Sequence, residues 1–180
     1  LQNLRVLQLI DSSIDLFKDF FKDQPDSTSF ASWMVNLIGD HTDYNSGFVM
    51  PTPLSLGIEV SLKPTQTRLI QGKTNLFSET ERQINAKTDG TWLDFVTGAI
   101  KVFYDEFPNC SKYLEKGIQL VVSSNLPSSS GVSSSAALEI ALLRAINKIE
   151  NQNLSQIKLA KLDQKIEHNF IGTKCGLMDQ

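Results

Sequence analysis

The sequence has 180 residues, of which 41% are hydrophobic and 21% are charged, and its net charge is −3. These values exclude wholesale disorder and allow one well-filled core. A chain without a basic field argues against a nucleic-acid partner, and no apolar run is long enough to predict a membrane span. Cys110 and Cys175 form neither a metal-ligand spacing nor a disulfide pattern, and no signal-peptide pattern opens the chain. We therefore expect reduced thiols and a cytoplasmic protein.

The first half of the chain mixes one helix with extended segments. Residues 11–23 place four apolar side chains on one helical face, with Asp11 or Ser12 as the N-cap. Residues 30–39 predict a buried strand, and residues 48–64 a further extended stretch with its two prolines at the beginning or at an edge. Residues 67–79 predict a hairpin that turns near Gly72.

The second half is richer in helices. Residues 91–107 have apolar side chains at helical spacing, and residues 116–127 predict a strand that runs into a polar loop. Residues 133–150 predict a helix that is apolar nearly all round and therefore buried. A last helix over residues 155–172 should end at Gly172. Because strands and helices are mixed without steady alternation, we predict an α+β fold as one domain over residues 1–180.

A dense polar cluster follows the strand predicted at residues 30–39. The stretch "NLIGDHTDYNSGF" places Asp40, His41, Asp43 and Tyr44 within five positions, and Gly47 closes it. Two carboxylates, an imidazole and a phenol at a strand end form either a solvated turn or a binding site. The residues alone leave both alternatives open.

The stretch "NLPSSSGVSSSAALE" (residues 125–139) joins a strand to a buried helix through a loop of serine and glycine. Such a loop directs unpaired backbone N–H groups and the positive end of a helix dipole toward one point, so it suits a phosphate group. Serine also caps helices, and one cap needs only one serine. Six serines surround Gly131, and this excess favours the phosphate cradle, although no Walker or G-x-G-x-x-G pattern occurs.

The end of the chain, "KIEHNFIGTKCGLMDQ", carries two carboxylates of different setting. Glu167 lies in the last turns of a helix and suits a divalent cation, whereas Asp179 follows two glycines and suits proton transfer. The ordinary alternatives are a solvated helix residue for Glu167 and a turn residue for Asp179. His41 and His168, the two histidines, show no metal-ligand spacing.

Taken in order, "VNLIGDHTDYNSGFVMP", "LPSSSGVSSSAALE" and "EHNFIGTKCGLMDQ" resemble the galactokinase branch of the GHMP small-molecule kinases. The resemblance covers about residues 30–180, and "HTDY" is its most specific part. It implies a GHMP kinase N-terminal domain with the ribosomal S5 domain 2-like architecture. It also implies ATP-dependent phosphorylation of galactose at the anomeric C1 hydroxyl, with ATP, Mg²⁺ and the sugar as partners. The same resemblance implies a C-terminal domain that these 180 residues lack.

The resemblance also implies residue roles. Asp40, His41 and Asp43 would bind sugar hydroxyls, with Gly176 lining the sugar pocket. Asp179 would contact the sugar and take the proton of the anomeric hydroxyl. Ser135 and Glu167 would position Mg²⁺. The nucleotide would contact Ser78 and the serine-rich loop of Ser129, Ser130, Gly131, Val132, Ser133, Ser134 and Ser135.

One departure from the family pattern bears on catalysis. The family reads Ala-Pro-Gly-Arg before "VNLIG", whereas this chain has Ala31, Ser32, Trp33 and Met34. The family arginine stabilises the transferring phosphoryl charge, and a thioether carries no charge and donates no hydrogen bond. We therefore expect impaired phosphoryl transfer with sugar binding retained.

Two rival functions follow from the same residues. The first is a non-catalytic sensor that binds galactose and ATP and addresses a protein partner, which Met34 favours. The second is a kinase for a related sugar such as an N-acetylhexosamine. Turnover separates the first rival from an enzyme, and saturation with each sugar separates the second.

Overall fold

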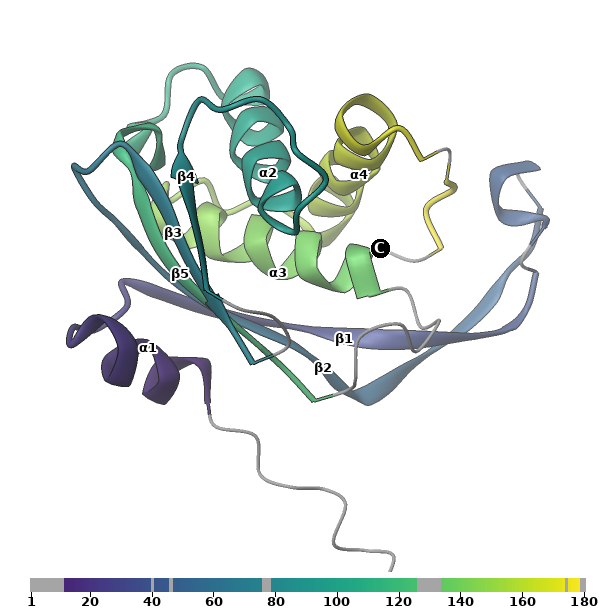
Figure 1. Ribbon diagram of the computed structural model, residues 1–180. Coiled ribbons are helices and arrows are strands. Elements are labelled where there is room, and N and C mark those ends of the chain that lie inside the picture. Colours follow the sequence, from purple (N-terminus) through teal and green to yellow (C-terminus); the bar gives the residue numbers. More distant parts are fainter. Residues whose placement is uncertain are drawn as a thin grey trace, which may run out of the picture.

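The computed structural model describes residues 12–39, 41–45, 47–75, 79–125, 134–173 and 175–178, with Ser134 described by its backbone alone. Within this part of the chain, five strands form one sheet in the order β1-β2-β5-β3-β4. Helices α2, α3 and α4 cover one face of this sheet and α1 lies on the other (Figure 1). The β3–β5 pair is parallel and the other pairs are antiparallel. The predicted α+β fold is confirmed.

The elements follow the predicted order with adjusted bounds. The strands are β1 (Ser27–Ile38), β2 (Met50–Pro64), β3 (Leu69–Thr74), β4 (Thr80–Gln83) and β5 (Ile118–Ser124). The α-helices are α1 (Ser13–Phe21), α2 (Leu93–Glu106), α3 (Ser134–Ile149) and α4 (Gln156–Ile166). Short helical segments are η2 (Asp43–Asn45), η3 (Tyr113–Lys116) and η4 (Glu167–Ile171).

Local signals account for several helix ends. The Ser12 hydroxyl accepts a hydrogen bond from the Ile14 N–H and caps α1, as one of the two predicted candidates. The four apolar residues predicted on one face of α1 are Ile14, Phe17, Phe20 and Phe21. Of these, Phe17 is fully buried and Phe20 is 39% exposed. The π-helical segment η4 continues α4 and ends at Gly172, whose φ of +92° is the left-handed conformation that glycine adopts easily. The predicted stop at Gly172 is confirmed.

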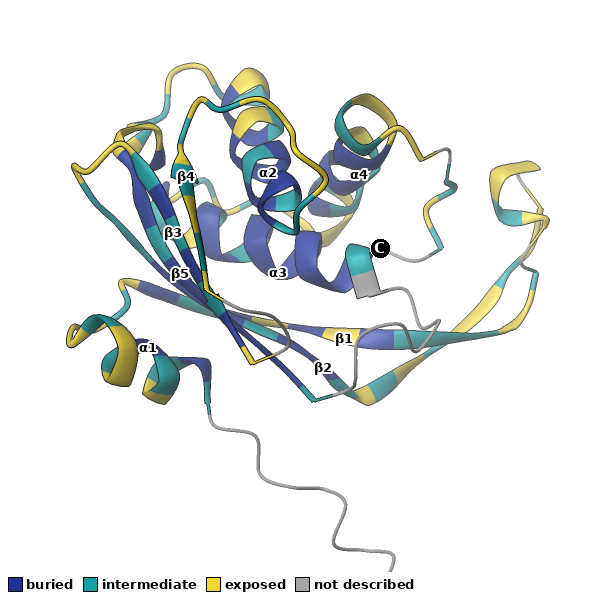
Figure 2. Cartoon of the chain, in the orientation of Figure 1, coloured by how far each residue is buried: buried dark blue, intermediate teal, exposed yellow. Residues whose placement is uncertain are grey.

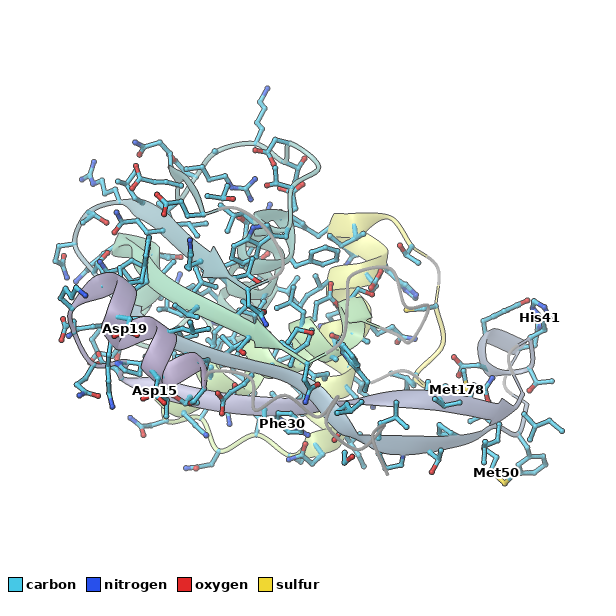
Figure 3. All side chains as sticks on the ribbon, turned by 60° about the horizontal axis from the view of Figure 1, so that its bottom comes forward. Asp15, Asp19, Phe30, His41, Met50 and Met178 are labelled. Carbon is cyan, nitrogen blue, oxygen red and sulfur yellow. The ribbon has the colours of Figure 1, made fainter. Side chains whose placement is uncertain are left out.

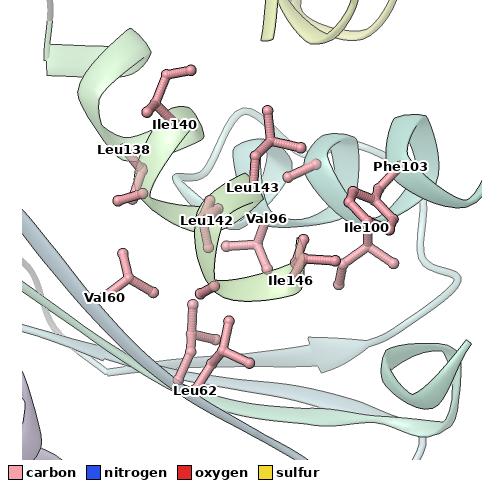
Figure 4. Close-up of a cluster of buried hydrophobic side chains, with 14 of the residues drawn as sticks. Val60, Leu62, Val96, Ile100, Phe103, Leu138, Ile140, Leu142, Leu143 and Ile146 are labelled. Carbon is pink, nitrogen blue, oxygen red and sulfur yellow. The ribbon is translucent and has the colours of Figure 1, made fainter. Parts of the chain in front are cut away.

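The core lies between α3 and the sheet and includes the side chains shown in Figure 4. Serines on β1 let α3 approach closely, because the Ser27 and Ser29 hydroxyls donate to the carbonyls of Ala145 and Ala141. Helix α3 also supplies a hydrogen-bond donor to the outer edge of β1, because Arg144 Nη1 donates to the Phe30 carbonyl oxygen at 2.7 Å. The prediction of a buried helix at this position is confirmed.

The predicted hairpin turn at Gly72 is wrong. Gly72 lies inside β3, where it pairs with Thr80 of β4, so the chain turns several residues later. A Cβ at Gly72 would lie 2.5 Å from the Trp92 ring. The glycine therefore serves the close packing of an indole against the strand.

The far ends of β1 and β2 form an arm that projects from the body of the domain (Figure 1). The strand predicted as buried is buried only in its first part, because Leu37 and Ile38 are 59% and 67% exposed. Figure 2 shows the same change from buried to exposed along the arm. Pro51 and Pro53 lie at the beginning of β2, as expected.

Candidate active site

The turn at the tip of the arm is organised by Thr42 and two glycines. The Thr42 hydroxyl lies 2.9 Å from the Gly39 carbonyl and 2.8 Å from the Phe48 carbonyl, and it is shared between these acceptors. Gly39 has a φ of +111°, and a Cβ there would lie 2.7 Å from the Phe48 carbonyl oxygen. A Cβ at Gly47 would lie 2.6 Å from the Thr42 Cβ. The polar cluster predicted from the sequence is therefore a tightly folded turn.

The side chains on this turn have different surroundings. His41 is exposed at the tip (Figure 3), and its Nδ1 lies 2.9 Å from the Tyr44 hydroxyl. Asp43 is half-buried and faces the C-terminal segment. The imidazole is thus held by its neighbour in the turn, whereas the carboxylate reaches a distant part of the chain.

Asp43 joins the turn to residues 175–178. Its two carboxylate oxygens accept hydrogen bonds from the backbone N–H groups of Leu177 at 3.1 Å and Met178 at 3.3 Å. A Cβ on Gly176 would lie 2.1 Å from the Asp43 carboxylate. The structure therefore brings Asp43 and Gly176, both predicted for the sugar pocket, into contact. A carboxylate has about four lone-pair positions, so Asp43 keeps acceptor capacity for a hydroxyl group.

A second set of contacts fixes the same segment from the side of α4. The Gln164 side-chain amide donates to the Cys175 and Gly176 carbonyls at 3.2 and 3.1 Å. His168 Nε2 lies 2.9 Å from the Cys175 carbonyl oxygen. The segment that precedes Asp179 in the sequence is thus held between α4 and the arm.

Met34 lies beside this segment. It pairs with Pro53 of β2 just after an irregularity in the strand register. A pocket of about 280 Å³ is lined by Met34 together with Met178 and residues Ala136 and Ala137 of α3. Met34 therefore lies near the start of α3 and the end of the described chain.

Three buried carboxyl groups, Glu139, Asp163 and Glu167, lie where α3 meets α4 and its continuation η4. Glu139 follows Ser135 by four residues, Asp163 precedes Glu167 by four, and all three acids are at most 5% exposed. Ser135 and Glu167 are predicted from the sequence, whereas Glu139 and Asp163 are not. The spacing of four residues on a helix, which places side chains on one face, is the signal that could have found them.

Burial raises the pKa of Glu139 far above its usual range, and the neighbouring Asp163 and Glu167 carboxylates add to this shift. Glu139 therefore keeps its proton at neutral pH. Among the described residues, no group of three His, Cys, Asp or Glu side chains is arranged to hold a metal ion. A hydroxyl and one carboxylate still fit Mg²⁺, which binds one or two protein oxygens together with phosphate and water.

Several predicted residues lie outside the described residues. They are Asp40, Ser78, Ser129, Ser130, Gly131, Val132, Ser133 and Asp179. Ser134 begins α3 with its backbone, and Ser135 follows in the first turn as a half-buried residue.

Comparison with known proteins decides the family. A model described as the N-terminal domain of GHMP kinases matches residues 94–180. A galactokinase galactose-binding signature matches residues 15–64, which include the arm and its turn. The chain belongs to the GHMP kinase family. Within it, the signature places this GHMP kinase domain with the galactokinases, as the resemblance predicted.

Individual relatives agree with this placement. The chain is 35% identical over 175 residues to a galactokinase of Haemophilus influenzae, covering 95% of this chain and 44% of the relative. It is 31% identical over 170 residues to a galactokinase of Clostridium perfringens, covering 91% and 43%. The GHMP kinase domain described here thus spans less than half the length of these relatives.

Solved structures show the same fold. A Lactococcus lactis galactokinase complexed with galactose superposes with a TM-score of 0.80 at 27% identity, covering 92% of this chain and 44% of the other. The Methanococcus jannaschii mevalonate kinase superposes with a TM-score of 0.70 at 23% identity, covering 84% and 49%. The latter likeness shows the fold alone. In the described part of the chain, no helix combines the length and the apolar character that a membrane span needs.

Proposed function

We propose that the protein carrying this domain phosphorylates galactose at its anomeric C1 hydroxyl, with ATP as the phosphoryl donor and the cytoplasm as its location. The observation that carries this proposal is the pair of hydrogen bonds from Leu177 and Met178 to Asp43. They bring the stretch matched by the galactose-binding signature against the segment that precedes Asp179 in the sequence. Phosphorylation of a sugar hydroxyl needs a sugar-recognition turn and a base on the same substrate, and the segment bound by Asp43 leads in sequence to the candidate base.

Each residue then has a defined task. Asp40, His41 and Asp43 accept or donate hydrogen bonds at the sugar hydroxyls, and Gly176 leaves room for the Asp43 carboxylate. Asp179 accepts the proton of the anomeric hydroxyl as that oxygen attacks the γ-phosphorus of ATP. The N–H groups at the start of α3 and the serine-rich loop of residues 129–135 hold the phosphates.

Ser135 and Glu167 would hold Mg²⁺ through a hydroxyl and a carboxylate. When bound, the ion neutralises charge on the phosphate oxygens.

Because of Met34, we expect slow phosphoryl transfer. The side chain lines the pocket shared with Met178 and offers no charge to the transferring phosphoryl group. In the full-length protein, Met34→Arg should raise the rate of ADP release with galactose and Mg-ATP by about a hundredfold or more. Met34→Leu serves as the uncharged control and should leave the rate unchanged. Equal rates in all three proteins would show that another cation replaces the arginine.

Met34 also favours a second candidate, a sensor that binds galactose and ATP without turnover. Equilibrium dialysis with labelled galactose separates it from the enzyme. Saturable binding without ADP release supports the sensor, whereas release coupled to binding supports the kinase. Saturation by an N-acetylhexosamine in place of galactose would assign the other rival function.

A further inference from the structure

A second concave surface lies on the domain away from the candidate active site. It occupies about 1160 Å³ between residues 84–88, which follow β4, the outer side of α2 and the segment η3. Its η3 end adjoins the start of β5, where Ile118 pairs with Pro64 at the end of β2. The arm lies at the opposite end of β2. We name this surface the α2 groove.

The unpaired positive charges of the domain gather in this groove. Six described Lys and Arg side chains have neither an ion pair nor a hydrogen bond, and they are Lys22, Arg68, Lys87, Lys101, Lys116 and Lys161. Four of these six, Arg68, Lys87, Lys101 and Lys116, line the α2 groove. The remaining described cations are neutralised by carboxylates or donate to carbonyl oxygens. The concentration stands out because the whole chain carries a net charge of −3.

The α2 groove is lined by fewer acidic than basic side chains. Glu115 and Asp105 are its acidic lining residues, and Glu115 is paired with Lys112 at 3.7 Å. Asp105 therefore opposes four cations. A surface with this balance attracts an anionic partner from solution and holds it through several exposed ammonium and guanidinium groups.

The lining also contains apolar surface. Ile84, Ile100 and Phe170 contribute carbon atoms, and Lys101 Nζ lies 5.9 Å from the Phe170 ring centroid. Gln66, Gln83 and Asn85 add side-chain amides that can pair with a peptide backbone. A partner peptide in an extended conformation, with acidic and apolar side chains in alternation, would complement these cations, amides and apolar atoms.

The size of the groove favours a peptide over a small molecule. Pockets for small ligands usually measure about 300–1,000 Å³ and bury most of the ligand. The α2 groove is larger, and Arg68, Lys87, Lys101 and Lys116 are all exposed to solvent. We propose that the α2 groove binds an extended acidic segment of a partner protein, at a surface separate from the sugar and nucleotide sites.

Fluorescence anisotropy with the 180-residue chain tests this proposal. The probe is a fluorescein-labelled peptide of alternating Glu and Leu residues, and the comparison probe has Lys in place of Glu. We expect saturable binding of the acidic probe alone, weakening as salt screens the charges. The double variant Lys87→Glu/Lys116→Glu should lower its affinity about tenfold or more.

The chain provides a matched control, because Lys22 and Lys161 are unpaired cations outside the groove. Lys22→Glu/Lys161→Glu makes the same change in net charge and should leave the affinity unchanged. An equal loss in both double variants would overturn the proposal by showing non-specific attraction. Full competition by ATP or inorganic phosphate would also overturn it, since the groove would then be a small-anion site. Thermal unfolding of both variants checks that each retains its fold.

Discussion

The body of the domain and its arm are stabilised in different ways. In the body, α3 lies between α2, α4 and the sheet, and side chains such as Leu62 and Leu142 are fully or almost fully buried (Figure 4). In the arm, Phe48 is 99% exposed, and the turn keeps its shape through hydrogen bonds around Thr42. Burial thus determines the fold, whereas local backbone geometry and Asp43 determine the candidate sugar site. Changes in one region should leave the other largely unaffected.

The largest expected effect is in the body. Leu142→Ala removes buried methyl groups from the centre of α3 and should lower the free energy of unfolding by about 2–5 kcal/mol. Phe48→Ala, the matched change in the arm, should alter it by less than about 0.5 kcal/mol. Urea denaturation followed by circular dichroism measures both. Similar losses would contradict the separation between body and arm.

Glu139 gives the body a characteristic pH dependence. Since its pKa is raised in the folded state, the folded protein holds a proton that the unfolded chain releases. The contribution of Glu139 to the free energy of unfolding is greatest below the ordinary glutamate pKa. Above that pH it falls by up to about 1.4 kcal/mol for each pH unit. Glu139→Gln should flatten this decline, and denaturation in metal-free buffer between mildly acidic and alkaline pH measures it. A parallel decline in the variant would show that another group titrates.

Gly176→Ala tests the connection between the arm and the C-terminal segment. The new Cβ would displace the Asp43 carboxylate and break its two hydrogen bonds to Leu177 and Met178. These amides should lose protection against hydrogen exchange equivalent to about 1–3 kcal/mol, with the core amides unchanged. Exchange measured by NMR gives this result without sugar. Unchanged protection would mean that Asp43 does not hold the segment.

The smallest effect belongs to a surface cluster on the body, in which one carboxylate meets two lysines. The Glu106 carboxylate accepts hydrogen bonds from Lys158 and from Lys165, which together lower its pKa to about 2. Glu106→Gln should therefore cost about 0.5–1 kcal/mol at neutral pH. The difference should vanish as the pH falls from the ordinary glutamate pKa toward 2, because the wild-type carboxylate is then protonated. Thermal melts of both proteins at several pH values provide the measurement.

Periodicity and end signals in the sequence were sufficient to predict the helices and most strands. Residues 91–107 have apolar side chains at helical spacing, residues 133–150 form a long segment that is apolar nearly all round, and Gly172 marks a helix stop. All three predictions are confirmed. The hairpin turn was predicted at the wrong place, because the sequence alone does not distinguish a glycine that makes room for Trp92 from a glycine in a turn. The exposure of Leu37 and Ile38 could not be predicted, since it depends on where the strand leaves the body.

The candidate site was predictable where a motif existed and not where contacts alone define it. The turn residues His41 and Asp43 and the glycine at 176 stood out as a resemblance. The contact of Asp43 with Leu177 and Met178 joins residues more than 130 positions apart, and no local pattern indicates it. Glu139 was hidden in a helix that reads as apolar, because one acid among many aliphatic residues suggests exposure until the partner helix is known.

The strand order has a consequence for how the chain folds. Strands β1 and β2 are neighbours in sequence, and so are β3 and β4, so each pair forms through short-range contacts. Strand β5 follows both pairs in the sequence, yet it lies between β2 and β3 and pairs with each. Closing loops of this length is slow, and the sheet is incomplete until β5 arrives. We therefore expect two early hairpins and a rate-limiting step in which β5 joins them, and α3, which follows β5 in the sequence, then packs on the completed sheet.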